Sequence, residues 1–228
     1  MTNTLVITGG SKGLGWAVAE KYLQNGWNVV SGSRTKRINI ADKFQNRFRQ
    51  IEMNVCDRVA HKNLVEEAIA WSGRIDCFIN NAGFSEWRSI DAIDNNFLTN
   101  IFETNLFGYF WGSQAAATAL REGGSILNIS SLAAKRGTLN NSAYSASKFG
   151  VTGLTQSLSK ELGPKGIRVN AVCPVLIETP GLMTALDAKY SPVDKNISSF
   201  LENFAQNQSA LGRLPTASEV AQLCLFLA

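Results

Sequence analysis

The stretch TLVITGGSKGLGWAVAEKYLQNG, residues 4–26, decides the fold class of this chain. It opens with a short apolar run that ends in glycine. Leu14, Val18 and Leu23 then recur at helical spacing until Gly26 ends the helix. The stretch therefore predicts a strand, a glycine-rich turn and a helix in direct succession.

The same alternation continues to residue 228. Further strands are predicted in WNVVSGS (27–33), FRQIEMNV (48–55), IDCFINNAG (75–83), SILNISS (125–131) and IRVNAVCP (167–174), and further helices over about 62–71, 96–120, 143–162 and 218–227. Such an alternation forms parallel βαβ units, and nearly continuous apolar strands indicate helices on both faces of the sheet. We therefore predict an α/β protein with a doubly wound parallel sheet, the Rossmann fold, as a single domain over residues 1–228.

Composition and charge narrow the range of partners. The chain has 45% hydrophobic and 18% charged residues, as expected of a globular protein, and its 22 basic residues are scattered, which argues against nucleic acid despite a net charge of +4. No apolar stretch reaches transmembrane length and the first strand leaves no room for a signal peptide, so we expect no membrane partner and a cytoplasmic location. The 4 cysteines form no CxxC pair and are expected to be reduced core thiols, with no metal site.

One segment is too long for a plain connection. Between Thr179 and Pro215, polar residues are mixed with scattered large apolar side chains. We expect one or two helices near 180–212. These helices form either a lid over a substrate or an ordinary packing excursion.

The turn TGGSKGLG lies at the first junction between strand and helix, where such folds bind dinucleotides. Its glycines permit positive φ and let backbone N–H groups approach a phosphate, and the helix N-terminus favours negative charge. A turn without a ligand is the alternative. The residues expected to bind the cofactor here are Gly9, Ser11, Lys12, Gly13, Leu14 and Gly15.

The end of the second predicted strand indicates which dinucleotide is bound. An NAD(H) site places a carboxylate there, whereas SGSRTKR offers Arg34 and no acid before Asp42. A guanidinium binds a 2′-phosphate through two parallel hydrogen bonds, and Lys12 adds a second positive charge. Two solvated cations are the alternative, but we predict NADP(H) in preference to NAD(H).

Tyr144 and Lys148 lie four residues apart in AYSASKFG, so they share one face of the predicted helix 143–162. The pair by itself is a weak signal, because four-residue Tyr–Lys spacings also arise by chance. The position of the pair downstream of the glycine turn favours a catalytic role over a chance match. We interpret the pair as catalytic.

Four motifs occur in a fixed order: TGGSKGLG at 8–15, NNAG at 80–83, NISS at 128–131 and YSASK at 144–148. ETNLFGYF (103–110) and RVNAVCPVLIETP (168–180) extend the pattern. Together they resemble the short-chain dehydrogenase/reductase family, in particular its 3-oxoacyl-reductase-like subgroup. The resemblance covers the whole chain and implies a Rossmann sheet of about seven parallel strands.

The resemblance assigns roles to individual residues. Tyr144 is similar to the family's catalytic acid/base and Lys148 to its partner, while Ser131, in preference to Ser130, resembles the serine that hydrogen-bonds the substrate oxygen. Asn105 matches the asparagine that holds a water beside the lysine. The implied cofactor contacts outside the glycine turn are Arg34, Asn54, Val55, Asn81, Ala82, Gly83, Tyr144, Lys148, Pro174, Ile177 and Thr179.

The resemblance implies an NADP(H)-dependent enzyme that interconverts a carbonyl and a secondary alcohol. The phenol of tyrosine has a pKa of about 10, and an adjacent ammonium is expected to lower the pKa of Tyr144. No metal or histidine is required, and His61 is expected to be solvated before a helix start. A catalytically silent relative that senses cofactor or acts as a scaffold is the alternative.

The sequence departs from the family in two places. Val175 stands where members carry glycine, which predicts a different path for the loop over the nicotinamide. The chain also ends at Ala228, directly after its last predicted helix, where the family continues through one more strand. The resemblance implies a homo-oligomer, a dimer or tetramer, formed through the helices near 97–120 and 143–162.

The substrate is left open as a small-molecule carbonyl or alcohol. Trp87 and Arg88 follow the NNAG motif and are expected to flank the site. Arg88 is either a ligand for an anionic substrate group or a solvated cation.

Overall fold

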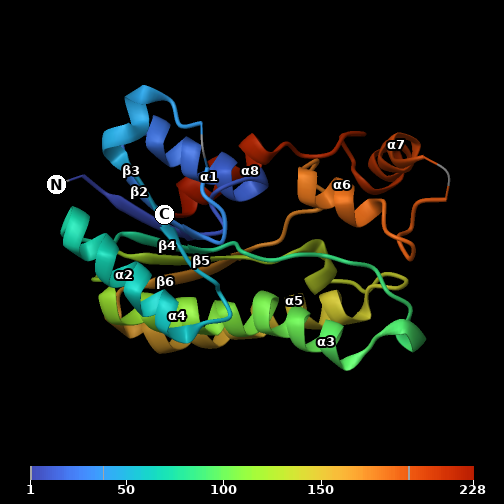
Figure 1. Ribbon diagram of the computed structural model, residues 1–228, viewed down its shortest axis with the longest axis horizontal. Coiled ribbons are helices and arrows are strands. Elements are labelled where there is room, and N and C mark those ends of the chain that lie inside the picture. Colours follow the sequence, from blue (N-terminus) through green and yellow to red (C-terminus); the bar gives the residue numbers. More distant parts are fainter. Residues whose placement is uncertain (1, 38, 195) are drawn as a thin grey trace.

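The computed structural model describes residues 2–37, 39–194 and 196–228. In this part of the chain six strands form one parallel sheet in the order β3-β2-β1-β4-β5-β6 (Figure 1). The strands are β1 (Thr4–Thr8), β2 (Asn28–Ser33), β3 (Phe48–Glu52), β4 (Cys77–Asn80), β5 (Ser125–Ile129) and β6 (Arg168–Val172). The predicted doubly wound Rossmann fold is confirmed.

Helices cover both faces of the sheet (Figure 1). They are α1 (Gly13–Gln24), α2 (Arg58–Ser72), α3 (Asn95–Phe102), α4 (Gly108–Ala119), α5 (Ser142–Leu162), α6 (Pro180–Leu186), α7 (Ile197–Gln208) and α8 (Ala217–Leu227). α1 and α8 pack together on one face, and α2, α4 and α5 lie on the other. Each face buries its own apolar cluster, which explains why the strands are apolar on both sides.

The strand order reverses between β1 and β4. In open α/β sheets the ligand crevice lies at such a switch point, outside the carboxyl ends of the strands. The loops after β1, β4, β5 and β6 therefore meet at one edge of the sheet.

The helix predicted over 96–120 is interrupted. α3 ends at Phe102, a π-helical turn occupies Glu103–Phe107, and α4 begins at Gly108. Such single wide turns are frequent at functional sites. Asn105 lies inside this one.

The prediction that His61 is solvated is wrong. The Asp57 side chain caps α2 by accepting from Val59 N at 2.9 Å, so the helix begins at Arg58, earlier than expected. His61 is therefore inside α2 and fully buried, with Nε2 2.8 Å from Val55 O. Burial lowers the pKa of His61, which keeps the imidazole neutral.

The cysteines are only partly as predicted. Cys77 and Cys224 are buried thiols, whereas Cys56 and Cys173 are half-buried, because they follow strands and face the loop edge. All four are free thiols.

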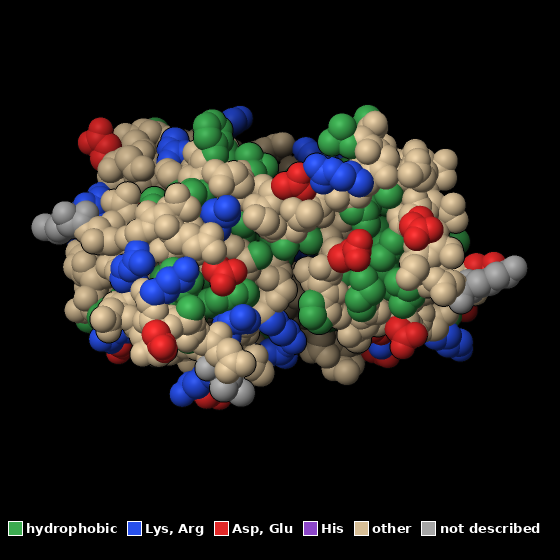
Figure 2. All heavy atoms as spheres, turned by 90° about the horizontal axis from the view of Figure 1, so that it is seen from above, with side chains coloured by type: hydrophobic (Ala, Val, Ile, Leu, Met, Phe, Trp, Pro, Cys, Tyr) green, Lys and Arg blue, Asp and Glu red, His purple; other side chains and the backbone are tan. Residues whose placement is uncertain are grey.

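The segment near 180–212 contains two helices, α6 and α7, as predicted. They lie beside the sheet rather than against a face of it (Figure 1). Their core is a cluster of Trp87, Ala185, Leu186 and Leu201. Hydrophobic side chains gather over the part of the surface that these helices form (Figure 2).

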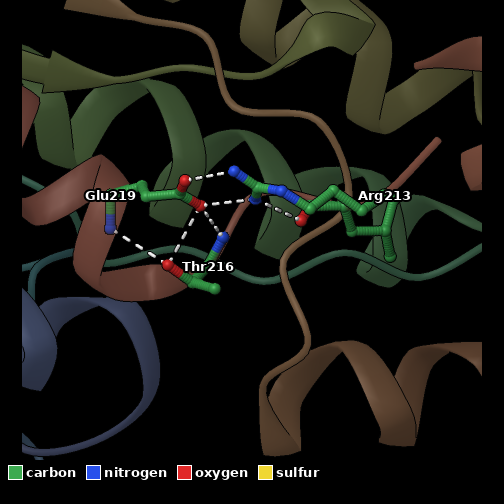
Figure 3. A network of polar contacts seen from close by, with 4 residues as sticks. Arg213, Thr216 and Glu219 are labelled. Atoms are coloured by element: carbon green, nitrogen blue, oxygen red, sulfur yellow. Dashed lines mark hydrogen bonds and ion pairs between the residues drawn. The ribbon is translucent and has the colours of Figure 1, made fainter. Parts of the chain in front are cut away.

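The segment after α7 is tied to α8 by a polar network (Figure 3). Arg213 donates to both carboxylate oxygens of Glu219, at 2.9 and 2.6 Å. Glu219 also accepts from Thr216 N at 2.8 Å, and Glu219 N donates to Thr216 Oγ1 at 3.2 Å, which completes a capping box. The carboxylate thus stabilises both the helix start and the end of the segment.

Glu219→Gln is expected to lower the Tm at pH 7 by about 1–4 °C, because the variant loses the carboxylate cap and the ion pair. The hydrogen bond from Arg213 lowers the pKa of Glu219 from 4.5 to about 2. A lowered folded-state pKa stabilises the protein above pH 4.5, and this contribution is lost as the pH falls through about 2. Thermal melts of wild type and variant should therefore converge over that range.

Glu66→Gln is the matched control. Glu66 pairs with Lys62 at 3.5 Å on the exposed surface of α2 but caps no helix. The Tm of Glu66→Gln should match the Tm of wild type at pH 7 and at about pH 2. A constant Tm difference for Glu219→Gln from pH 7 to pH 2 would contradict the role of the ionised carboxylate.

Candidate active site

Apart from Asn105, Tyr144 and Lys148, which lie on helical turns, the residues predicted to act together come from six different loops at the carboxyl edge of the sheet. The glycine turn follows β1, Arg34 follows β2, and Asn54 and Val55 follow β3. The loops after β4, β5 and β6 carry the remaining residues, which are Asn81, Ala82, Gly83, Ser131, Pro174, Ile177 and Thr179. Parallel strands present all their carboxyl ends at one edge, so residues far apart in sequence become neighbours.

The glycine turn has the backbone that its sequence predicts. Gly9 and Gly13 have positive φ, at 71° and 55°. A Cβ on Gly15 would lie 2.2 Å from Gly9 O, so only glycine is accommodated there. Lys12, the N-cap of α1, offers no side-chain cap, which leaves the first amides of the helix available to an anion.

The loop after β6 closes over this turn. Thr179 lies within 3.6 Å of the position of a Cβ on Gly13 and caps α6 by accepting from Leu182 N. Ile177 is buried. Pro174 accepts a backbone hydrogen bond from Leu132 N at 2.8 Å, which ties this loop to the one after β5. Among the described non-glycine residues only Asn140 has positive φ, so Val175 fits the loop without strain.

A cavity of about 460 Å³ lies at the carboxyl ends of β2 and β3. Arg34 and Asn54 line it, as expected of a site for the adenosine end of a dinucleotide. Two carboxylates, Glu52 and Asp57, also line it, and Asp57 is committed to capping α2. Val55 is buried beside the cavity and its carbonyl binds His61.

A second arginine, Arg37, approaches the glycine turn. Its guanidinium stacks 3.8 Å from the centroid of the Trp16 ring, and Nη1 donates to Ser11 O at 3.3 Å. The Gln50 side chain holds the Arg37 backbone through two hydrogen bonds, at 2.6 and 3.0 Å. Sequence reasoning assigned no role to Arg37, although a tryptophan on the first turn of α1 offers a surface for an arginine.

The Asn81 side chain fastens β4 to the glycine turn. Its amide nitrogen donates to Thr8 O at 3.0 Å and to Gly9 O at 3.2 Å, and Ala82 N donates to Thr8 Oγ1. Gly83 lies against Asn105, since a Cβ there would be 3.0 Å from Asn105 Oδ1 and 3.7 Å from Lys148 Nζ. NNAG therefore connects the glycine turn to the region around Lys148.

Ser131 and Tyr144 face each other. Ser131 follows β5 and its Oγ accepts from Ala133 N at 3.1 Å. Tyr144 lies in the first turn of α5, and a side-chain hydrogen bond with Ser131 acts to lower the pKa of its phenol. The neighbouring Ser130 is buried and donates to Lys148 O at 3.2 Å. The structure thus brings Ser131, not Ser130, to Tyr144.

Lys148 is buried, and its ammonium hydrogen-bonds to groups other than Tyr144. Nζ donates to Ile129 O at 2.9 Å and to Tyr109 Oη at 3.2 Å, and lies 5.8 Å from the centroid of the Tyr144 ring. The expectation that Lys148 lowers the pKa of Tyr144 is not met. Burial raises the pKa of Tyr144, and only the hydrogen bond with Ser131 opposes this.

Asn105 is held by the π-helical turn with its side chain fully buried. Its amide nitrogen donates to Phe84 O at 2.8 Å, and its carbonyl accepts from Phe84 N at 3.0 Å. The same nitrogen lies 3.5 Å from Ser147 Oγ, which donates to Tyr144 O. Asn105 thus links the loop after β4 to the helix that carries Tyr144.

Arg88 is partly exposed to solvent and lies in ion pairs of its own loop. Its guanidinium pairs with Glu86 at 2.7 Å and Asp94 at 3.2 Å, so its charge is neutralised within the loop after β4. Trp87 is buried against α6 and α7 instead of lining an open site.

The described residues contain no group of three or more His, Cys, Asp and Glu side chains placed to hold a metal ion. No helix in the same ranges has both the length and the apolar character needed to span a membrane.

A glycine turn that opens a helix at the switch point of a doubly wound sheet is the arrangement of dinucleotide-binding proteins. A sequence model of the short chain dehydrogenase family matches residues 3–189. The chain is 32% identical to an L-2,3-butanediol dehydrogenase of Corynebacterium glutamicum, over 100% of this chain and 92% of the relative. It is 32% identical to a 3-oxoacyl-(acyl-carrier-protein) reductase of Thermotoga maritima, over 98% and 89%. The chain belongs to the short-chain dehydrogenase/reductase family and is 3-oxoacyl-reductase-like.

Solved structures agree. The ligand-free aldohexose dehydrogenase of Thermoplasma acidophilum superposes with a TM-score of 0.86 at 30% identity, over 100% of this chain and 87% of that one. A variant of actinorhodin polyketide ketoreductase with NADPH gives a TM-score of 0.87 at 26% identity, over 99% and 90%. The protein is therefore an oxidoreductase of a family that interconverts carbonyl and alcohol groups with a nicotinamide cofactor.

Proposed function

We propose that this protein is an NADP(H)-dependent reductase that converts a small-molecule carbonyl to a secondary alcohol, and the alcohol back to the carbonyl. The observation that carries the proposal is the placement of Ser131 after β5, Tyr144 in the first turn of α5 and the buried Lys148 at the edge that holds the glycine turn. The family relationship supports the same reaction class.

The residues present fit a dinucleotide. A Cβ on Gly15 would collide with Gly9 O, so glycine keeps the turn tight, and the uncapped amides of α1 suit a pyrophosphate. We assign the phosphates to Gly9, Ser11, Gly13, Leu14 and Gly15. Asn54 and Val55 would hold the adenine. The nicotinamide end would lie along Asn81, Ala82, Gly83, Tyr144, Lys148, Pro174, Ile177 and Thr179. When bound, the cofactor supplies the hydride.

Tyr144 acts as the acid in reduction. Because burial raises its pKa, the phenol stays protonated at neutral pH and can donate its proton to the developing alkoxide. Ser131 stabilises the same oxygen through a hydrogen bond. Lys148 places a positive charge beside the carbonyl of Ile129, and Asn105 holds the backbone of Phe84. The protonated phenol is the form that carbonyl reduction requires, and alcohol oxidation requires it to lose its proton first.

Arg34 and Lys12 supply positive charge for a 2′-phosphate, and Arg37 adds a third cation beside Ser11. No carboxylate occupies the end of β2. Two related structures, the polyketide ketoreductase and a variant of ElxO, contain NADPH. These observations favour NADP(H) over NAD(H). Glu52 also lines the cavity, and its carboxylate would repel a 2′-phosphate.

Arg34→Asp is expected to lower the preference for NADPH over NADH by about 10²-fold, because a guanidinium that binds phosphate is replaced by a repelling carboxylate. Isothermal titration with both cofactors at fixed ionic strength measures the two Kd values. Arg121→Asp is the matched control, since this exposed arginine precedes β5 at the opposite edge of the sheet. Equal preference in wild type and Arg34→Asp would contradict the assignment of Arg34.

We propose that α6 and α7 act as a substrate lid. Their apolar cluster includes Trp87 from the loop after β4, and the segment begins directly after Thr179. A lid joined to both loops can exclude water from the reacting carbonyl.

We also propose a homo-oligomer formed through α4 and α5. A groove of about 540 Å³ runs between these helices and is lined by Phe110, Trp111 and Leu158. Phe110 and Phe149 are about half exposed on the same helices. Exposed apolar side chains clustered on one face favour contact with a second copy of this chain over contact with water.

The decisive experiment follows NADPH oxidation with a panel of ketones, diketones and 3-oxoacyl thioesters. Turnover of any of them supports the enzyme. Tight NADPH binding without turnover across the panel would favour a cofactor-sensing or scaffolding protein.

A further inference from the structure

Tyr109 lies on α4 directly after the π-helical turn, and its side chain is almost fully buried. Its hydroxyl donates to Ile129 O at 2.8 Å. Lys148 Nζ donates to the same carbonyl at 2.9 Å and to Tyr109 Oη at 3.2 Å. The three polar groups form a closed triangle behind the site.

The direction of each hydrogen bond in this triangle is fixed. Lysine ammonium has only donors, and a carbonyl has only acceptors, with two lone pairs. The Tyr109 proton must therefore point to Ile129 O, and its oxygen must accept from Lys148. Burial raises the pKa of Tyr109 far above neutral pH, so this phenol stays protonated and the pattern persists.

We propose that Tyr109 is a positioning residue that keeps the Lys148 ammonium charged and fixed beside Ile129 O. The proposal rests on the assigned role of Lys148 in the proposed function. The two hydrogen bonds of the Tyr109 hydroxyl go to Lys148 Nζ and Ile129 O, so the bond to Lys148 is its link to the assigned catalytic residues.

The surroundings of Lys148 explain why it needs such a partner. Burial lowers its pKa from 10.5 to about 7, and the charge of Cys173 opposes this shift. The ionisable groups that face it are Tyr109 on α4, Tyr144 on its own helix and Cys173 after β6. No described carboxylate pairs with it. A hydrogen bond that favours the charged form raises a pKa, so the Tyr109 oxygen holds the ammonium against desolvation.

The test is the pKa of Lys148 in Tyr109→Phe, measured by carbon-13 NMR titration of the lysine side chains in the cofactor-free protein. Lys148→Arg assigns the signal. Wild-type Lys148 should titrate near pH 7. In Tyr109→Phe it should titrate about 1–2 pH units lower, because a hydrogen bond to a charged group is lost.

Tyr22→Phe is the matched control. Tyr22 is also fully buried, and its hydroxyl donates to Cys224 O at 2.8 Å, far from Lys148. Both variants should lose similar resistance to urea, but only Tyr109→Phe should move the Lys148 titration. An unchanged Lys148 titration in folded Tyr109→Phe overturns the proposal, as does an equal shift in Tyr22→Phe.

This titration needs no substrate and no turnover, so its failure is separate from a failure of the proposed function. In the active enzyme, Tyr109→Phe should also move the alkaline limb of kcat for carbonyl reduction to lower pH by the same amount. A lower kcat with an unshifted pH profile would show a structural role only.

Discussion

Replacing Tyr144 with phenylalanine is expected to lower kcat for carbonyl reduction by about 10²–10⁴-fold and to change the Kd for NADPH far less, because the ring that lines the nicotinamide end is kept. The substitution removes the one proton donor that Ser131 orients, and it keeps the ring that packs beside Phe97 and Ile101. Stopped-flow NADPH oxidation gives kcat, and fluorescence titration gives the Kd. Thermal melts should show that the variant remains folded.

The two adjacent serines provide a control on the same strand end. Ser131→Ala should lower kcat for carbonyl reduction, since the hydroxyl that stabilises the reacting oxygen is lost. Ser130→Ala removes a buried hydrogen bond to Lys148 O and should act mainly on the Tm. If Tyr144→Phe retains wild-type kcat on a substrate that wild type reduces, Tyr144 is not the acid.

Gly15→Ala is expected to weaken NADPH binding by about 10- to 100-fold and to lower the Tm. The new Cβ would lie 2.2 Å from Gly9 O and 2.5 Å from Asn81 Nδ2. Neither group can move away without a large cost in free energy. The Gly9 carbonyl belongs to the backbone of the glycine turn, and the Asn81 side chain is hydrogen-bonded to that turn. Titration calorimetry and differential scanning fluorimetry measure the two effects.

Gly153→Ala tests the same chemical change at an open position. Gly153 lies on the exposed face of α5, and a Cβ there meets nothing within 4 Å. This variant should bind NADPH like wild type and gain about 0.5–1 kcal/mol of stability. Equal NADPH affinity in Gly15→Ala and Gly153→Ala would show that the turn does not form the phosphate cradle.

The fold was predictable because its signals are local and repeated. Glycine turns, apolar runs and helical spacing each act over a few residues, and their order along the chain implies the parallel sheet. The edge that collects Ser131, Tyr144 and the glycine turn then follows from topology alone.

What the sequence did not predict depends on tertiary contacts. Arg88 was expected at the site, but Glu86 and Asp94 neutralise it within one loop. The wide turn at Glu103–Phe107 contains no glycine or proline, so the sequence carries no signal for the interruption.

The protonation states of Tyr144 and Lys148 could not be predicted from the sequence either. Tyr144 and Lys148 are neighbours on a helix, which suggested direct stabilisation of a phenolate. The Lys148 ammonium instead donates hydrogen bonds to the backbone carbonyl of Ile129 and to the hydroxyl of Tyr109. A carbonyl presented by the end of a strand has no signature in the side-chain sequence.

His61 has a further use that follows from its position. It is the only histidine in the chain, and its Nε2 contacts the carbonyl of Val55, next to the Asn54 that lines the cavity at the ends of β2 and β3. The chain therefore has a single set of histidine resonances, and burial lowers the pKa of this imidazole below its ordinary value. If the adenosine end of the cofactor binds as proposed, addition of NADPH is expected to shift these resonances.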